Sequence, residues 1–530
     1  MGSRSSAIRF VIGASLGLLS GILMVAALQP VAIWPLILLG LVPMILAQHL
    51  LLPLRWCWVP VSFTAFVYVL GSYSQIFLAH ALWYALLAPL LVSVCVIPLA
   101  LIDRVLALRY RYVFFVVQMP VMWTGLDALR QNFALSGTGG YPVYALSYQP
   151  TLIQPVSLTG ISGLELLILV VNYAVALAIL AVILRRTSPG TQPTHIQPAV
   201  STTVLTVTVT AMLVVTWSIT GTWLTTSVAS NSGPTVRVAA VQPGAFQANL
   251  GSAPTAAQLI QIQDALGAMT RKAAAAGAQV VVWPEESLPF QPLQGPAASK
   301  AWFQDLLRTT GVTLVTGYVD PQPDGGYENR AGVFTPNGQL LGTYTKAHHA
   351  PFDNDVFPVG TSFPSFATDV SGSAATDTPK HSAGSVPVTI GMVICFDYDF
   401  PYTVRFTTLS GANMIAAPAW QFGALGRIGE EQKLIFDAVM SRVPAVSADL
   451  AWTSIIVQAN GEVVNQSITS DPSGESALLV GDVQLGPRDS PYLMLGNWVG
   501  TLCVFATLLI LGWGFAIEFR RRRSAVGDQA

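Results

Sequence analysis

The sequence predicts a bundle of membrane-spanning helices joined to one layered α/β domain. The first observation is composition: the 530 residues are 52% hydrophobic and 10% charged, whereas a soluble protein usually carries about 25% charged residues. The second is a set of eight apolar segments, each close to the roughly 20 residues that a helix needs to cross a bilayer core. The third is the segment 230–490, in which strand and helix patterns alternate.

The predicted spans form seven consecutive segments and one more near the C-terminus. The first is not a cleavable signal peptide by its pattern, because a second apolar run follows at once without a small-residue cleavage site. We expect the spans at residues 8–28, 31–48, 58–79, 83–102, 112–129, 163–184, 202–224 and 495–517. They divide the chain into an N-terminal bundle of seven spans (1–229), an α/β domain (230–490), and a last span with a basic tail (491–530).

Arginine placement predicts the orientation of these spans, because cytoplasmic loops carry an excess of Lys and Arg. The outside loops between spans hold little besides Arg130. With both termini in the cytoplasm, the inside segments hold Arg4, Arg9, Arg55, Arg104, Arg109, Arg111, Arg185, Arg186 and Arg520 to Arg523. The α/β domain is then expected outside the cytoplasm. The net charge of −1 argues against a nucleic-acid binder, which needs a large basic surface.

The α/β domain is predicted from about residue 234 onward. The run VRVAAV at 236–241 reads as a buried strand, and AQVVVW at 278–283 as the next one. We expect further strands at 312–318, 330–335, 388–395, 413–417, 452–458 and 476–481, and helices at 254–277 and 426–440. Residues 368–386, rich in Ser, Thr, Ala and Gly, are expected to form a surface insertion.

The loop 125–162 is long, faces outward in this plan, and is rich in Gly, Pro, Tyr and Gln. Long loops often carry function, although an ordinary connector is the alternative. The four cysteines are distributed unevenly: three lie in strongly apolar segments, and only Cys395 lies in the α/β domain. Cys395 therefore has no disulfide partner within that domain.

Three residues with complementary chemistry follow predicted strands, where α/β folds place their sites. They are Glu285, Lys346 and Cys395. A thiol with a reference pKa near 8.5 needs a base or a nearby cation to act as a nucleophile at neutral pH. A carboxylate can take the proton, and a lysine can stabilise an oxyanion. Taken singly, Cys395 could be a core residue, Glu285 a helix cap and Lys346 a surface lysine.

Three stretches that carry these residues, VVVWPEES, YTKAHHAPF and VICFD, resemble the nitrilase superfamily in order and spacing. That superfamily has a Glu–Lys–Cys triad on an αββα sandwich. With eight spans, the chain is similar to the bacterial apolipoprotein N-acyltransferase family. The outer loop carries further similarities, namely DALR at 127–130, GYP at 140–142 and SYQ at 147–149.

The resemblance implies a mechanism and substrates. Glu285 would be the general base, Cys395 the nucleophile and Lys346 the oxyanion stabiliser, with the backbone N–H of Phe396 as a second donor. A phospholipid would donate an acyl chain to the cysteine. The N-terminal amine of a diacylglyceryl-cysteine apolipoprotein would then accept it. The resemblance also implies a bacterial cytoplasmic (inner) membrane location, and we expect a monomer without cofactor or bound metal.

Several positions depart from the family pattern. Where the family reads PFGE, this chain has Pro351, Phe352, Asp353 and Asn354, so that an amide replaces a carboxylate that assists the site. The usual Glu two residues after the nucleophile is Asp397. These changes put the acceptor in doubt more than the reaction class.

The remaining candidates are aromatic residues for an acyl-chain pocket: Trp420, Phe422 and Phe352, with Tyr148 near the membrane interface. Packing in the core is the alternative for each. Two other functions stay open. One is a membrane-tethered nitrilase-like amidase, or an acyltransferase with another acceptor. The other is a degenerate homologue that binds without catalysing.

Overall fold

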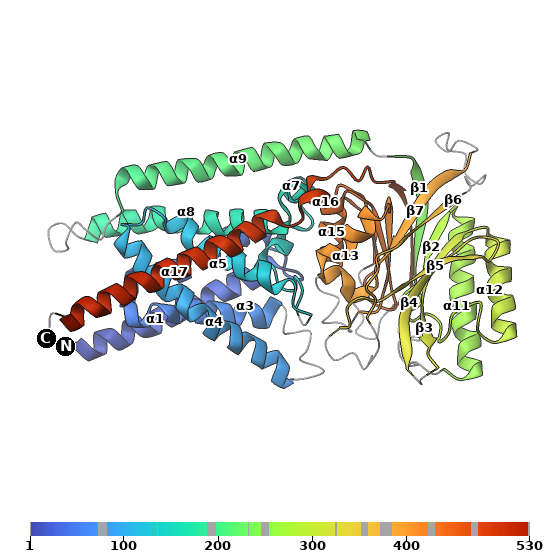
Figure 1. Ribbon diagram of the computed structural model, residues 1–530, viewed down its shortest axis with the longest axis horizontal. Helices are drawn as coiled ribbons and strands as arrows, with labels where there is room; N and C mark the ends of the chain where they lie inside the picture. Colours follow the sequence, from blue (N-terminus) through green and yellow to red (C-terminus); the bar gives the residue numbers. More distant parts are fainter. Residues whose placement is uncertain are drawn as a thin grey trace.

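The molecule has two parts that follow each other along its long axis, a helical bundle and a two-sheet domain (Figure 1). The computed structural model describes residues 2–72, 82–134, 136–187, 198–231, 233–244, 254–323, 326–350, 359–370, 384–421, 430–467 and 475–527. Most of the predicted surface insertion, residues 371–383, lies outside the described residues. Both chain ends lie at the end of the bundle that is remote from the sheets (Figure 1).

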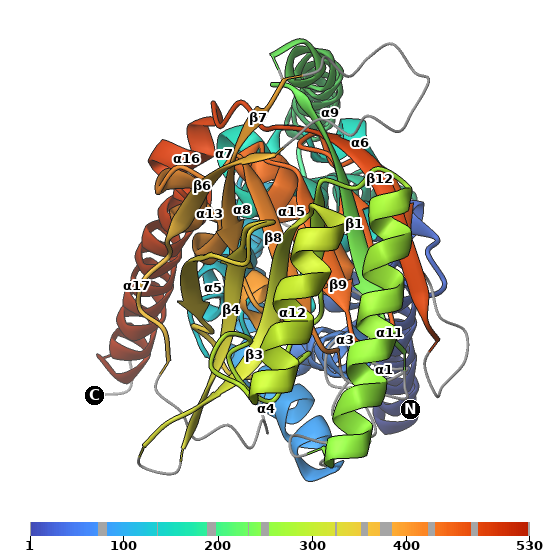
Figure 2. The same cartoon turned by 90° about the vertical axis from the view of Figure 1, so that its right-hand side faces the viewer.

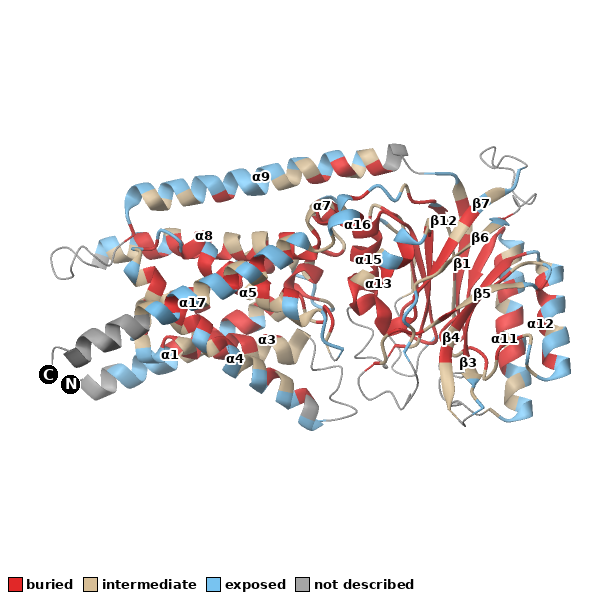
Figure 3. Ribbon diagram, in the orientation of Figure 1, coloured by how far each residue is buried: buried red, intermediate tan, exposed pale blue. Residues whose placement is uncertain are grey.

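The bundle is built from long apolar helices and several short helical elements. Its long helices are α1 (Gly2–Ala27), α3 (Trp58–Ser72), α4 (Leu82–Arg109), α5 (Phe115–Arg130), α8 (Ile161–Thr187), α9 (Val200–Asn231) and α17 (Trp498–Gly527). The short elements are η1 (Trp34–Leu38), α2 (Val42–Leu46), η2 (Ala47–Leu51), η3 (Leu54–Trp56), η5 (Pro142–Leu146), α6 (Pro150–Ile153), α7 (Val156–Thr159) and α16 (Pro491–Leu495). Helix α9 runs along the outside of the bundle, with much of its surface exposed (Figures 1 and 3).

Seven stretches in the described part of the chain are long and apolar enough to cross a membrane. They are Ser6–Ala27, Trp34–Leu51, Leu54–Ser72, Ala85–Arg109, Ile161–Arg186, Val200–Val228 and Trp498–Ile517. The chain is therefore a multi-pass membrane protein. The predicted eighth span, 112–129, corresponds to α5, which has only 16 residues and carries Asp127 and Arg130 near its end. Helix α5 packs against α8 and α17, so the count of eight spans is approximate.

The α/β domain contains two six-stranded sheets. Sheet A has the strand order β12-β1-β2-β3-β4-β5, and sheet B the order β11-β10-β9-β8-β7-β6. The strands of sheet A are β1 (Thr235–Gln242), β2 (Val280–Val282), β3 (Thr313–Pro321), β4 (Tyr327–Phe334), β5 (Leu340–Thr345) and β12 (Ala477–Gln484). Those of sheet B are β6 (Ser365–Val370), β7 (Val386–Met392), β8 (Met414–Ala419), β9 (Ala445–Asp449), β10 (Ile455–Val457) and β11 (Val463–Gln466).

The two sheets pack face to face, and helices cover both outer faces (Figures 1 and 2). Helices α11 (Ala256–Ala275) and α12 (Ala297–Thr310) cover sheet A, while α13 (Pro401–Leu409) and α15 (Glu430–Ser441) cover sheet B. Strand β1 shows how sequence alternation builds these layers. Its Val236 and Val238 face the core between the sheets, whereas Ala239 and Val241 face the core under α11 and α12. The result is the αββα sandwich that the family resemblance implied.

The helix layer of sheet B packs directly on the membrane bundle, so one hydrophobic core continues from the bundle into α13 and α15. Tyr144 from the long loop meets Phe436 of α15 edge to face, with ring centroids 5.3 Å apart. The backbone N–H of Thr138 donates to the carbonyl of Asp399 at 2.8 Å. Buried residues fill this junction as they fill the space between the sheets (Figure 3). The loop 125–162 is therefore more than a connector, because it docks the sandwich.

We predict that Phe436→Ala destabilises the protein strongly. Phe436 is fully buried at the junction, and removal of a buried Phe side chain costs about 3–5 kcal/mol. Thermal unfolding in detergent measures the effect. Phe406→Ala is the matched control, because Phe406 is 42% exposed. Equal losses of stability in the two variants would contradict the conclusion that packing at the junction stabilises the protein.

Candidate active site

Glu285 lies in a tight turn just after strand β2. The N–H of Trp283 still donates to Val315 of β3 at 2.8 Å, and the N–H of Ser287 donates to Gly317 at 3.1 Å. A Cβ atom on Gly317 would come within 2.6 Å of the Glu285 Cα atom. Glycine at position 317 thus allows β3 and this turn to approach closely. Residues before and after Glu285 are thus hydrogen-bonded to β3, which fixes the direction of the Glu285 side chain.

Lys346 follows strand β5 and reaches the Glu285 carboxylate. Its Nζ atom donates to Glu285 Oε1 at 2.8 Å, and the side-chain amide of Asn329 donates to the same oxygen at 2.7 Å. The N–H of Lys346 donates to the carbonyl of Asn329 at 2.9 Å. Glu285 and Lys346 are only 3% and 2% exposed. Burial of a charge is costly unless it is paired and hydrogen-bonded, and both conditions are met here.

Cys395 follows strand β7 on the opposing sheet and begins the short helix η7 (Cys395–Asp399). Its φ is +46°, a left-handed conformation that non-glycine residues rarely adopt and that costs about 1–3 kcal/mol where it occurs. Such strain is concentrated at functional sites. The thiol is 5% exposed and donates to the carbonyl of Trp420 at 3.4 Å.

Asp397 connects the cysteine turn with the lysine segment. On its own side, Asp397 Oδ2 accepts from the N–H of Ile394 at 3.0 Å. Across the sandwich it accepts from the Tyr344 hydroxyl at 2.7 Å and from the N–H groups of Ala347 and His348 at 3.1 and 2.8 Å. Burial, followed by the Asp397 charge, raises the pKa of Tyr344 well above its usual value, so Tyr344 stays a donor. This carboxylate holds the two halves of the site together.

His348 belongs to the same network. Its Nδ1 lies 3.0 Å from Asp397 Oδ1, and its Nε2 pairs with the Tyr402 hydroxyl. The ring stacks on Phe400 with centroids 3.7 Å apart. Asn329 and Tyr344 were not singled out from the sequence. The signal in the sequence was Asp397, a carboxylate two residues after Cys395, which implied that hydrogen-bond donors lie close to it.

Asp449 ends strand β9 on the other side of Glu285. Its carboxylate accepts from the N–H groups of Gln421 and Ala451, both at 2.9 Å, and from that of Trp452. The pKa of Asp449 is raised to about 6; burial is the largest cause, the three N–H donors oppose the shift, and the charge of Glu285 adds a smaller increase. Asp449 therefore fixes the segment after Trp420 in the neighbourhood of the buried pair.

The other predicted residues are placed as follows. Phe396 is buried with Ala350 and Phe400, and Trp420 is half-buried next to the thiol. Tyr148 instead contacts Glu431 and Gln466, each at 3.3 Å, at the junction with the bundle. The predicted residues Phe352, Asp353, Asn354 and Phe422 lie outside the described residues.

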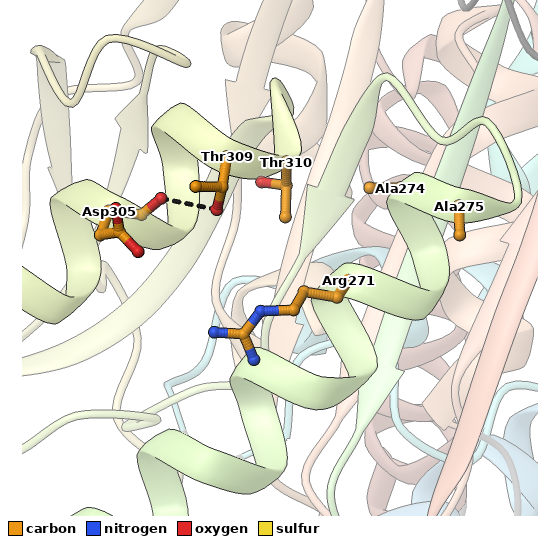
Figure 4. A pocket seen from close by; sticks show the side chains of 6 residues that line it. All are labelled: Arg271, Ala274, Ala275, Asp305, Thr309 and Thr310. Atoms are coloured by element: carbon orange, nitrogen blue, oxygen red, sulfur yellow. Dashed lines mark hydrogen bonds between the residues drawn. The ribbon is translucent and has the colours of Figure 1, made fainter.

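A pocket of about 480 Å³ lies elsewhere, between helices α11 and α12 on the outer face of sheet A (Figure 4). It is lined by Arg271, Asp305 and Thr309 among others. The sheet separates it from Cys395, so it is not part of the candidate site. Among the described residues, no group of His, Cys, Asp and Glu side chains is arranged to hold a metal ion.

Two family matches cover the two parts of the chain. Residues 20–174 match the apolipoprotein N-acyltransferase N-terminal domain, and residues 237–487 match the carbon-nitrogen hydrolase family. The chain belongs to the apolipoprotein N-acyltransferase family of the nitrilase superfamily. The first match covers most of the membrane bundle and the second covers the sandwich, in the order in which the two parts occur in this chain.

Similar proteins include members with and without a matching bundle. The apolipoprotein N-acyltransferase of Geobacter metallireducens is 27% identical over 433 residues, covering 78% of this chain and 76% of that protein. The omega-amidase NIT2 of Danio rerio is 28% identical over 242 residues, covering 41% of this chain and 80% of that protein. Among solved structures, an amidase from Nesterenkonia sp. covers 49% of this chain and 94% of its own, with 20% identity and a TM-score of 0.36.

We predict that Asp397→Asn lowers stability by roughly 1–3 kcal/mol, because an amide cannot accept all the hydrogen bonds that the carboxylate now accepts and leaves buried donors unsatisfied. Thermal unfolding in detergent is the measurement. Asp369→Asn, at an exposed position of β6, is the control and should be neutral. A neutral Asp397→Asn would mean that this carboxylate does not hold the two halves together.

We also predict a pH dependence from Asp449. Burial raises its folded pKa from 3.8 to about 6, so the folded state binds this proton more tightly than the unfolded chain. The contribution of Asp449 to stability is then fully present below 3.8 and is lost as the pH rises through about 6. Relative to Asp449→Asn, the wild type should lose on the order of 2–3 kcal/mol between acidic and neutral pH. A pH-independent difference in melting temperature would refute this.

Proposed function

We propose that this chain is a membrane acyltransferase that moves a fatty acyl group from a phospholipid, through a thioester on Cys395, to the N-terminal amine of a diacylglyceryl-cysteine apolipoprotein. The observation that carries this proposal is the buried pair of Lys346 and Glu285 after strands of sheet A, together with a strained Cys395 after a strand of the opposing sheet, in a chain that also carries the family's membrane bundle. The bundle matters because both substrates are anchored in the bilayer, and a membrane-embedded enzyme meets them there.

In the first half-reaction, Glu285 takes the thiol proton of Cys395 as the sulfur attacks the ester carbonyl of the phospholipid. The Lys346 ammonium group and the backbone N–H of Phe396 stabilise the oxyanion of the tetrahedral intermediate. The C–O bond to the glycerol then breaks, and Glu285 returns the proton to the leaving lysophospholipid hydroxyl. An acyl-cysteine thioester remains.

In the second half-reaction, the amine of the apolipoprotein attacks the thioester carbonyl. Glu285 accepts a proton from the amine, the oxyanion is stabilised by the same donors, and the C–S bond breaks. The thiolate recovers the proton from Glu285, which leaves an amide product and the free enzyme. Asn329 supports both halves by donating to the Glu285 oxygen that also faces Lys346, so the carboxylate keeps its position while it gains and loses a proton.

The setting of this reaction follows from the charge distribution and the fold. The arginine bias supports a topology with both termini in the cytoplasm and the sandwich outside it. We include in the proposal the division into bundle (1–229), catalytic domain (230–490) and C-terminal span with basic tail (491–530), action as a monomer, and contacts of the acyl chain with Trp420, Phe422, Phe352 and Tyr148. Asp353, Asn354 and Asp397 are proposed to adjust acceptor choice, since the family pattern has Gly, Glu and Glu at these three positions.

An amidase or hydrolase activity is the second candidate. The similarity of the α/β domain to an omega-amidase favours it, because a thioester that meets water instead of an amine gives hydrolysis. A degenerate homologue that only binds lipoproteins is less consistent with the satisfied, buried Glu285–Lys346 pair.

The deciding experiment is acyl-enzyme formation by the purified full chain with a phospholipid that carries a labelled acyl chain. We expect protein-bound label that neutral hydroxylamine releases, and none in Cys395→Ala. Cys95→Ala is the matched control, because Cys95 is an exposed cysteine of α4 and should label normally. Glu285→Gln and Lys346→Met should each lower labelling by at least about a hundredfold. The double variant removes both buried charges together and so separates loss of chemistry from loss of folding.

A diacylated lipopeptide is then added to the labelled enzyme. Transfer of the label to the peptide amine, faster than its release into water, is the expected result. Equal release with and without peptide would favour the amidase. If the folded wild type never takes up label, the remaining hypothesis is a degenerate homologue that binds lipoproteins without catalysing a reaction.

A further inference from the structure

An apolar groove lies on the bundle between helices α4, α5 and α17. Its volume is about 540 Å³, within the range of sites that hold small ligands. We call it the α4–α17 groove, and its lining includes Leu106, Tyr110, Phe114, Val117, Leu509 and Trp513. These residues belong to the membrane-spanning helices α4 and α17, to α5, or to the turn that joins α4 to α5.

The groove faces the lipid rather than the interior of the bundle. Phe114, Val117, Leu509 and Trp513 are 54%, 47%, 75% and 58% exposed. Large apolar side chains with this exposure on a spanning helix contact acyl chains. The walls are fixed, because Trp513 Nε1 of α17 donates to the Tyr110 hydroxyl of α4 at 2.7 Å. Trp and Tyr are typical of the membrane–water interface, which gives the groove one end near the headgroups.

That interface is the one remote from the catalytic domain. The other end of α5 approaches the sandwich, since Arg130 donates to Gly139 and the neighbouring Thr138 donates to Asp399. The start of α5, at Phe115, is therefore the far end, where both chain termini also lie (Figure 1). A lipid bound in the α4–α17 groove is consequently far from Cys395 and is not positioned to be the acyl donor.

Positive charge lies at the same end of the groove. Arg109 and Arg111 flank Tyr110 in the chain, and both are exposed. The acidic residue closest in sequence, Asp103, is fully buried and accepts from Gln48, His49 and Gln118. The two exposed charges that flank Tyr110 in the chain are thus both basic. Basic clusters beside grooves between membrane helices recognise anionic lipid headgroups.

We propose that the α4–α17 groove binds an anionic phospholipid of the leaflet remote from the catalytic domain. One acyl chain lies against Val117, Leu509 and Trp513, and the phosphate contacts Arg109 and Arg111. This lipid is a structural ligand, distinct from the substrates in the proposed reaction. It fills the space between α4 and α17 and joins the last helix to the rest of the bundle.

Native mass spectrometry of the detergent-purified full chain tests this binding with palmitoyl-oleoyl phosphatidylglycerol as the probe and the matching phosphatidylcholine as the neutral comparison. We expect wild type to retain one phosphatidylglycerol molecule in preference to phosphatidylcholine. The variant Arg109→Gln/Arg111→Gln should bind phosphatidylglycerol at least about tenfold more weakly than wild type does. The matched control is Arg185→Gln/Arg186→Gln, which removes two exposed arginines at the end of α8 and should bind as wild type does.

Val117→Trp fills the groove without changing charge and should weaken retention of both lipids, while the melting temperature reports whether it folds. Equal retention of the two lipids by wild type would overturn the proposal. So would equal losses in the two arginine double variants, which would show general charge attraction alone. A dimer that Val117→Trp dissociates would overturn it as well, because a second copy of the chain would then occupy the groove.

Discussion

The carboxylate of Asp397 is the constraint on which the site depends. Glu285 and Lys346 follow strands of sheet A, whereas Cys395 follows a strand of sheet B. Apolar packing between the sheets sets their spacing but is non-directional. Asp397 adds direction, because it accepts from Ile394 on one side and from Tyr344 and His348 on the other. A small shift of one sheet against the other would break these hydrogen bonds, so the relative position of the three reactive groups is fixed.

The membrane bundle reaches the same turn from behind. Helix η7 has Cys395 at one end and Asp399 at the other. Lys433 of α15 pairs with the Asp399 side chain at 2.5 Å, and Gly137 is so close that a Cβ atom there would lie 2.5 Å from the Asp399 carbonyl oxygen. Gly137 has a φ of +46°, which glycine adopts without strain. The loop 125–162 and the turn that carries Cys395 therefore belong to one packed unit.

Much of this could be predicted from the sequence, for physical reasons that particular residues illustrate. Glu285 and Cys395 follow strands of strongly apolar residues, and the chemical types of Glu285, Lys346 and Cys395 are complementary. The strands β5, β6, β9 and β11 were not predicted. Strand β9, AVSAD, is almost free of β-branched residues, and β6 and β11 lie at sheet edges, where one side is unpaired and apolar patterning is weak. Asn329 and Tyr344 were missed because their partners come from distant strands. Helix α5 was predicted as a full span from its apolar residues, many of which are buried where it packs against α8 and α17.

The connection between bundle and sandwich has an evolutionary consequence. Strand β1 enters the sandwich from α9 and pairs antiparallel with β12, which leaves it toward α17; Thr235 lies opposite Gln484. The two ends of the sandwich are thus side by side, the geometry in which a domain can be inserted into another chain without disturbing either fold. A sandwich with adjacent ends could therefore be acquired between two membrane helices in a single event.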